Sequence, residues 1–151
     1  MKDNAPLLSV EDLKVYFRKD DRIARAVDGV SYDVGRAETV CLVGESGCGK
    51  TVSALAILGL IPRPPGEIRG GRILWNGREN LLNFDEEALR SVRGNKIGMV
   101  FQEPLTSLNP VFTIGDQIAE AIRIHESADP RELQERTIGL LQEVGIPSAE
   151  H

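Results

Sequence analysis

The sequence predicts an α/β fold with a β-rich N-terminal part and a helical C-terminal part. Runs of β-branched and aromatic residues near the N-terminus are typical of strands. A glycine-rich segment, residues 44–51, stands between a short apolar run and a stretch of small and apolar residues that favours a helix. Two segments that begin with helix-capping residues close the chain.

Three strands are expected before the glycine-rich segment. Residues 7–17 combine alternation with β-branched and aromatic side chains, and residues 23–34 form a second strand in which Gly29 is a candidate bulge. The charged residues 19–22 are expected to form the turn between them. Residues 38–43 are largely apolar, which predicts a short strand buried on both faces.

A helix and a hairpin are expected after that segment. The helix covers residues 50–60 and is ended by the prolines in residues 62–66. A strand at residues 73–75 precedes Asn76 and Gly77, a pair that favours a tight turn because both residues tolerate positive φ.

The C-terminal half is expected to contain three helices and one strand. Asn83, with Glu86 three residues later, has the spacing of a capping box for a short helix. Residues 96–101 are interpreted as a buried strand, followed by a loop over residues 102–110. Thr113 with Asp116 caps the next helix. Asp129, Pro130 and Glu132 supply the N-cap, the first-turn proline and the acidic third position of the last helix, which ends at Gly145.

Composition limits the classes of function. The net charge is −5, and such an acidic balance argues against a nucleic-acid partner because phosphate neutralisation needs clustered Lys and Arg. Cys41 and Cys48 lack metal-site spacing and are interpreted as free thiols of a reducing compartment. The longest apolar stretch, residues 52–61, is shorter than the roughly 20 residues that cross a bilayer. No direct membrane span is expected.

The glycine-rich segment matches the phosphate-binding pattern G-x-x-x-x-G-K-[ST]. Its glycines let the backbone N–H groups turn inward, and the following helix N-terminus adds a partial positive charge. Lys50 would bridge the β- and γ-phosphates of ATP, and the Thr51 hydroxyl would bind Mg²⁺. The candidate nucleotide-binding residues of this loop are Gly44, Glu45, Ser46, Gly47, Cys48, Gly49, Lys50 and Thr51. The motif alone indicates a P-loop NTPase and leaves kinase, GTPase, motor and transporter open.

A second motif narrows the class. Residues 99–110 read MVFQEPLTSLNP, in which an apolar run delivers Gln102 into a loop. This segment, with its continuation through residue 118, resembles the Q-loop region of ABC ATPases, in the branch of oligopeptide and dipeptide importers. Residues 13–17, 26–31 and 44–47 resemble the same branch. The resemblance implies that residues 1–112 are the N-terminal part of an ABC ATP-binding core and residues 113–151 an incomplete helical subdomain.

The resemblance also implies roles and partners. Gln102 would contact Mg²⁺ or the attacking water, so that Lys50 and Gln102 would be the catalytic residues and Thr51 and Gln102 the metal-binding ones. Phe17 would stack on the adenine, with Tyr16 as its neighbour on the opposite strand face. The Gln102 loop would face transmembrane permease subunits, and a second ATP-binding subunit would complete the nucleotide site. The location would be peripheral, on the cytoplasmic face of the cell membrane.

Other elements of the family pattern do not occur in the chain. We find no LSGGQ-type signature, and residues 81–86 only imitate the apolar run ending in Asp-Glu, because Asn83 interrupts it. His125 and His151 do not occupy the expected switch position and are interpreted as solvated. The chain is therefore expected to be truncated, poorly stable and without steady-state hydrolysis. A soluble ABC-type ATPase acting on ribosomes or nucleic acid, and a non-catalytic nucleotide-binding fragment, remain as alternatives.

Overall fold

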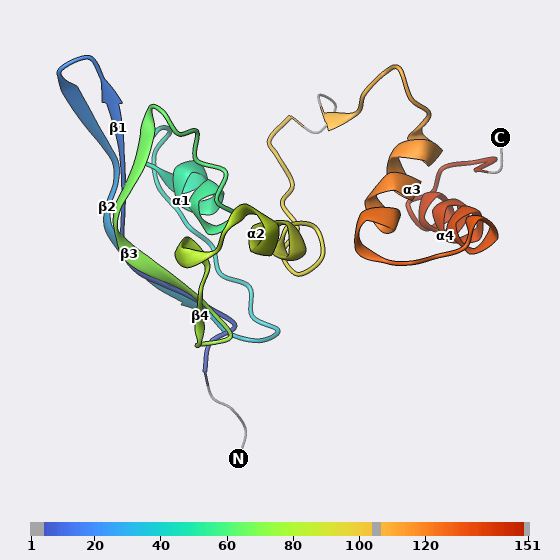
Figure 1. The fold of residues 1–151 in the computed structure, drawn as a ribbon, viewed down its shortest axis with the longest axis horizontal. Helices are drawn as coiled ribbons and strands as arrows, with labels where there is room; N and C mark the ends of the chain where they lie inside the picture. The colour runs from blue at the N-terminus through green and yellow to red at the C-terminus, as the bar shows by residue number, and fades with distance from the viewer. Residues whose placement is uncertain (1–4, 104–106, 150–151) are drawn as a thin grey trace. The chain divides into compact units, whose positions relative to one another are not determined.

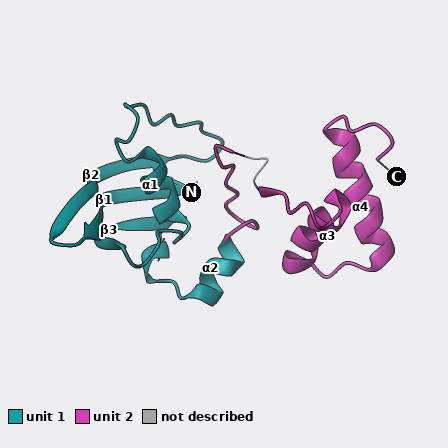
Figure 2. Ribbon diagram, turned by 90° about the horizontal axis from the view of Figure 1, so that it is seen from above, with its two compact units in different colours: residues 1–92 teal, residues 93–151 magenta. Residues whose placement is uncertain are grey.

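The computed structural model describes residues 5–103 and 107–149, and it divides the chain into two compact units. Unit 1 is Met1–Val92 and unit 2 is Arg93–His151 (Figure 2). The predicted boundary at residue 112 rests on sequence motifs, whereas the division after Val92 reflects contacts between residues. The boundary at residue 112 stays a prediction. Pro104, Leu105 and Thr106 of the Q-loop resemblance, and His151, lie outside the described residues.

Unit 1 is built on an antiparallel sheet with the strand order β2-β1-β3-β4 (Figure 1). Its strands are β1 (Leu8–Lys19), β2 (Arg22–Val34), β3 (Gly66–Trp75) and β4 (Glu79–Asn80). The two predicted N-terminal strands are therefore confirmed. Asn76 and Gly77, with φ of 52° and 68°, form the predicted turn between β3 and β4.

The predicted bulge at Gly29 is also present. Leu13 pairs with Val30 and Lys14 pairs with Asp28, so that Gly29 on β2 has no partner on β1. Gly29 has a φ of 84°, a conformation that glycine adopts without the steric cost of a Cβ. The extra residue increases the local twist of the hairpin formed by β1 and β2.

The core of unit 1 lies on one face of this sheet. Leu13, Val15 and Ile73 are completely buried. Helix α1 (Lys50–Ile57) packs on β1 and β2 and contributes the buried residues Ser53 and Ala56. The helix ends earlier than predicted because Gly59, at a φ of 63°, turns the chain back so that its N–H bonds to the Ala56 carbonyl.

Two predicted strands are wrong. Residues 38–43 and 96–101 have no strand assignment, apart from an isolated bridge at Ile97. Their apolar side chains are largely exposed: Val43 is 93% exposed and Val100 is 90% exposed. A strand buried on both faces needs hydrogen-bonded neighbours and covering layers. Within the described residues no strand pairs with either segment, so the apolar pattern alone did not produce a strand.

The short helix of unit 1 also begins differently from the prediction. Residues Leu81–Asn83 form the 3₁₀ helix η1, and α2 covers Glu86–Val92. The carboxylate of Asp85, not the amide of Asn83, accepts the hydrogen bond from the Ala88 N–H at 2.8 Å. Leu89 also donates its N–H to the Asp85 carbonyl, so Asp85 caps α2. Residues 81–86 thus form η1, a two-residue link and the first residue of α2, so no strand ends at this acidic pair.

In the part of unit 2 that the structure describes, the α-helices are α3 (Ile114–His125) and α4 (Pro130–Glu143). Both predicted caps are confirmed: the Thr113 hydroxyl accepts from the Asp116 N–H, and the Asp129 carboxylate accepts from the N–H groups of Arg131 and Glu132. No residue of α3 is buried, whereas α4 buries Leu133 and Thr137. Among the described residues, none of the helices is both long and apolar enough to span a membrane.

Candidate nucleotide-binding site

The glycine-rich loop leads directly into α1 and is held against the sheet. Helix α1 begins at Lys50, with Gly49 as its N-cap at a φ of 95°. A Cβ on Gly49 would come within 2.1 Å of the Ala26 carbonyl oxygen on β2. Only glycine therefore permits this approach of loop to strand, and the contact fixes the N-terminus of α1 on the bulged part of β2.

The Lys50 ammonium lies over the curled loop. Its Nζ donates hydrogen bonds to the carbonyl oxygens of Gly44, at 2.8 Å, and Glu45, at 2.7 Å. The Cys48 Sγ lies 3.5 Å from the same nitrogen, and the Cys48 N–H faces the Glu45 carbonyl at 3.4 Å. The loop thus closes around one positive charge, which can exchange these neutral oxygens for anionic ones.

The remaining loop residues are open to solvent. Gly44, Glu45, Ser46, Gly47 and Cys48 are all exposed, with Gly47 at a φ of 80°. A Cβ on Gly44 would meet the Cys48 sulfur at 2.6 Å, so the loop is tight at its start. The sequence predicted this loop as a unit, and the structure brings its residues together at one helix N-terminus.

Phe17 and Tyr16 lie on opposite faces of the sheet. Val15 pairs with Val27, and Phe17, two residues further, pairs with Ala24, which places all four on the core face. Val27 is also the side chain that a Cβ on Gly49 would meet at 3.4 Å. The half-buried Phe17 ring is therefore on the sheet face that carries the glycine-rich loop.

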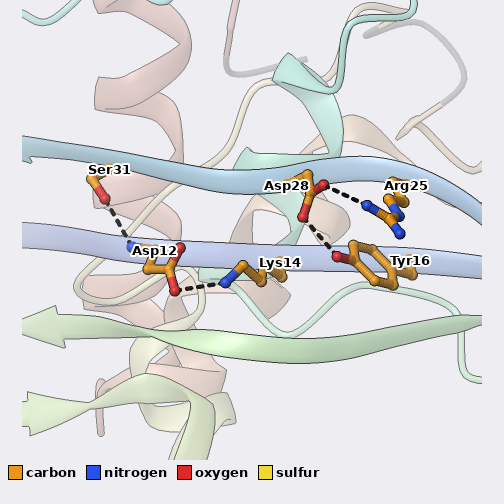
Figure 3. A network of polar contacts seen from close by, with 6 residues as sticks. All are labelled: Asp12, Lys14, Tyr16, Arg25, Asp28 and Ser31. Carbon is orange, nitrogen blue, oxygen red and sulfur yellow. Dashed lines mark hydrogen bonds and ion pairs between the residues drawn. The ribbon is translucent and has the colours of Figure 1, made fainter.

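Tyr16 belongs to a polar network on the other face (Figure 3). Its hydroxyl donates to Asp28 at 2.6 Å, and the Arg25 guanidinium lies 3.3 Å from the second Asp28 oxygen and over the Tyr16 ring. The hydrogen bond to Asp28 raises the pKa of Tyr16, and the same bond lowers the pKa of Asp28, assisted by Arg25. Alongside, Lys14 pairs with Asp12 at 2.8 Å. Tyr16 is thus engaged away from the loop.

A cavity of about 800 Å³ opens beside Phe17 at the end of the hairpin. Its walls come from the β1–β2 turn and from the segment before β3. The lining residues are Phe17, Arg18, Lys19, Asp20, Asp21, Arg22, Ala24 and Pro65. Sequence reasoning missed Pro65, because it interpreted the prolines in residues 62–66 only as the end of a helix.

The donor set fits a phosphate group with a Mg²⁺ ion. Thr51 is exposed in the first turn of α1, where its hydroxyl can reach an ion bound beside phosphates. Mg²⁺ commonly takes one or two protein oxygens, with water and phosphate filling its other positions, so a single hydroxyl suffices. Among residues 5–103 and 107–149, no group of three or more His, Cys, Asp or Glu is arranged for a metal. Gln102 is exposed and belongs to unit 2, and its approach to this loop stays a prediction.

Comparison with known families identifies the family of the chain. The sequence profile of the ABC transporter family matches residues 27–151, which include the loop, α1 and both helices of unit 2. The chain belongs to the ABC transporter family. The predicted family and α/β P-loop fold are thereby confirmed. The loop at residues 44–51 lies within the matched region, at the start of α1, and its role in phosphate binding stays a prediction.

Two relatives show the branch that this ABC chain resembles. A protein of Brucella abortus assigned to peptide import as an ATP-binding protein is 50% identical over 148 residues, which cover 95% of this chain. The oligopeptide transport ATP-binding protein AppD of Bacillus subtilis is 44% identical over 144 residues. In both cases the match covers 44% of the relative, so the chain spans less than half the length of these relatives.

Solved structures support the fold. The ATP-binding cassette MJ0796, in a dimeric post-hydrolysis state with ADP and Pi, matches with a TM-score of 0.76 at 20% identity. The match covers 89% of this chain and 56% of that one. At this identity the likeness establishes the ABC cassette fold, and it leaves the roles of individual side chains to the geometry of this chain.

Proposed function

We propose that this chain binds the triphosphate of ATP through residues 44–51, as part of the ATP-binding subunit of a peptide-type ABC importer. The observation that carries the proposal is the Lys50 ammonium, held over a curled glycine loop at the start of α1. Anions are stabilised at such a helix N-terminus by backbone N–H groups and by the helix dipole. The family match and the peptide-import relatives supply the context.

Each site residue has a chemical task in this proposal. Lys50 exchanges its carbonyl partners for phosphate oxygens and thereby offsets their charge. Phe17 offers its ring to the adenine beside the cavity, on the face that carries the loop. Thr51 supplies a hydroxyl to Mg²⁺, an ion that neutralises charge between phosphates. Gln102 senses the γ-phosphate or orients water, and the activity of the whole subunit is ATP hydrolysis that drives solute import.

The proposed partners are permease subunits and a second ATP-binding subunit. The segment after Gln102 exposes apolar side chains, with Val111 81% exposed and Phe112 58% exposed. Exposed apolar groups of this kind are suited to contact with another protein. Both relatives are named for transport or import of peptides, which supports a peripheral position at the membrane beside a permease. The net charge of −5 disfavours the alternative of a nucleic-acid or ribosome partner.

The proposal is tested by titrating the chain with Mg-ATP and, separately, with tripolyphosphate in a calorimeter. Both ligands are expected to bind, because the loop recognises phosphate oxygens, and ATP is expected to bind more tightly through its base. Circular dichroism before the titration establishes that the sample is folded. If neither ligand gave heat at millimolar concentration with a folded sample, the proposed function would be wrong.

A further inference from the structure

Gly66, at the start of β3, lies directly against the Phe17 ring. The two residues are paired across the antiparallel strands β1 and β3. A Cβ built on Gly66 would lie 3.0 Å from Phe17 Cε1, 2.5 Å from Ile61 Cγ2 and 2.8 Å from the Pro62 carbonyl oxygen. Gly66 is buried, so the missing side chain leaves space that the ring and Ile61 use.

Two backbone hydrogen bonds hold the segment of residues 62–66 at this place. The Gly66 N–H donates to the Pro62 carbonyl at 2.8 Å and closes the turn on itself. The Arg18 N–H donates to the Pro65 carbonyl at 3.0 Å and ties the turn to β1 immediately after Phe17. Pro65 also lines the cavity that Phe17 borders. The turn therefore contacts the Phe17 ring through Gly66 and contributes Pro65 to the wall of the same cavity.

We propose that Gly66 is a positioning residue that fixes the Phe17 ring for contact with the nucleobase. This inference rests on the proposed function, because it assigns a residue to the base end of the same site. Gly66 does not touch the nucleotide. Its lack of a side chain lets the ring lie against the turn, so that the cavity in front of the ring stays open to a flat base.

The physical consequence of adding a methyl group at residue 66 follows from which neighbour can move. Ile61 is 5% exposed and packed, and the Pro62 oxygen belongs to the hydrogen-bonded turn. The Phe17 ring is half-buried and borders open space, so it is the group with room to turn. Alanine at residue 66 shifts the turn and Ile61, whose atoms lie nearer to the new Cβ than the ring does. The ring, which loses this support and borders open space, turns toward the cavity and occupies the volume offered to a base.

Gly70 provides a matched control in the same strand. A Cβ on Gly70 would meet only Lys14 Cδ, at 3.7 Å, which is an ordinary van der Waals distance. Gly66→Ala and Gly70→Ala thus make the same chemical change in β3, at one position that touches Phe17 and one that does not.

The experiment measures the affinity for Mg-ATP and for tripolyphosphate in the wild type and in both variants. Gly66→Ala is expected to lower the ratio of ATP affinity to tripolyphosphate affinity about fivefold, as expected for loss of a stacking contact. Tripolyphosphate binding should stay unchanged, and Gly70→Ala should leave the ratio unchanged. In a Phe17→Leu background, Gly66→Ala should have no further effect on the ratio.

The possible failures are distinguishable. A wild type that binds neither ligand contradicts the proposed function, whereas normal binding with an unchanged ratio in Gly66→Ala contradicts only the role of Gly66. A fall in both affinities would show a general loss of structure and would also overturn the inference.

A second measurement needs no substitution at residue 66. The aromatic ring should shift the Gly66 Hα resonances, so Phe17→Leu should move them and leave those of Gly70 in place. Mg-ATP should perturb the Gly66 resonances more than tripolyphosphate does. The proposal would be refuted if the Gly66 resonances did not change on Phe17→Leu and responded equally to Mg-ATP and tripolyphosphate. This test holds even if Gly66→Ala fails to fold.

Discussion

The sheet of unit 1 and the helix pair of unit 2 differ in how completely they bury their apolar side chains. Leu13 and Ile73 of the sheet are completely buried. In unit 2, by contrast, α3 buries no residue, and Ile124 is 67% exposed. The glycine-rich loop is thus attached to a packed scaffold, whereas the segment after Gln102 leads into helices with exposed apolar side chains.

This difference teaches that the two halves of the proposed site depend on different kinds of contact. The loop at residues 44–51 obtains its shape from contacts within unit 1, above all that of Gly49 with the Ala26 carbonyl. Within unit 2, the α-helix that follows Gln102 is α3, which packs on α4 but buries none of its own residues. Packing within unit 1 therefore supports the proposed phosphate loop directly, whereas packing within unit 2 supports the proposed sensing segment only weakly.

The largest effect is expected from removing core volume in the sheet. Leu13→Ala should lower the free energy of unfolding by about 2–5 kcal/mol, because it leaves a cavity at a fully buried position. Ile124→Ala, at an exposed position of α3, should change it by less than about 0.5 kcal/mol. Urea unfolding followed by circular dichroism measures both. Equal losses for the two variants would break the comparison between the units.

The next largest effect is expected at the ammonium over the loop. Lys50→Ala should weaken Mg-ATP binding at least about thirtyfold, because charge-assisted hydrogen bonds to phosphate contribute about 1.5–3 kcal/mol each. Lys96→Ala, which removes an exposed lysine of unit 2, is the matched control and should bind normally. Calorimetry gives both affinities. Normal binding by Lys50→Ala would mean that the loop does not hold the triphosphate.

The two cysteines of unit 1 allow a labelled position inside the glycine-rich loop to be compared with one outside it. Both thiols are exposed, but only Cys48 lies in the loop, with its sulfur 3.5 Å from Lys50 Nζ. Alkylation of Cys48 in a Cys41→Ser chain should block nucleotide binding, and Mg-ATP should slow that labelling. Alkylation of Cys41 in a Cys48→Ser chain should do neither. Mass spectrometry follows the labelling, and equal rates with and without Mg-ATP would count against the site.

The smallest effect is expected on the outer face of the sheet. Tyr16→Phe removes the hydrogen bond between the Tyr16 hydroxyl and Asp28. This bond raises the pKa of Tyr16 and is the largest cause of the lowered pKa of Asp28. Because the pKa of the Asp28 carboxyl is lowered, its ionised form stabilises the folded chain at pH values above the ordinary pKa of 3.8. This stabilisation is lost as the pH falls below that value. Because the pKa of the Tyr16 phenol is raised, its protonated form stabilises the folded chain at pH values below the ordinary pKa of 10.0. This stabilisation is lost as the pH rises above that value.

Wild type should therefore melt slightly above Tyr16→Phe between these two limits, and the difference should vanish in stronger acid or base. Thermal unfolding over a pH series measures this difference. Binding of Mg-ATP should be the same in both proteins, because Tyr16 lies on the face opposite to the loop. A weakened affinity in Tyr16→Phe would contradict the assignment of the two faces.

Local signals in the sequence predicted the parts of the fold that local contacts determine. The Gly29 bulge, the Asn76–Gly77 turn and the caps at Thr113 and Asp129 are each fixed by a few neighbouring atoms. The cap of α2 was misplaced because Asn83 and Asp85 are both suitable capping residues at nearby positions. Propensity alone does not decide between them.

The strands predicted at residues 38–43 and 96–101 failed for the opposite reason. Their apolar character reports a preference for burial, but a strand exists only when another strand pairs with it. For the proposed site, the G-x-x-x-x-G-K-[ST] pattern correctly predicted a glycine-rich loop that leads into α1, and its binding of phosphate stays a prediction. The contact of Gly66 with Phe17 could not be predicted, because it depends on the register between β1 and β3.

The hydrogen bonds of Lys50 have a further consequence for selectivity. The Lys50 ammonium already donates hydrogen bonds to two carbonyl oxygens. An incoming anion must therefore replace these oxygens as the acceptor of the hydrogen bonds. The gain on binding is the difference between anionic and neutral acceptors. Weak anions such as chloride or bicarbonate gain little from that exchange, whereas a polyphosphate gains at several oxygens at once. In the proposed site, the loop would thus discriminate against the abundant small anions of a cell before any base is recognised.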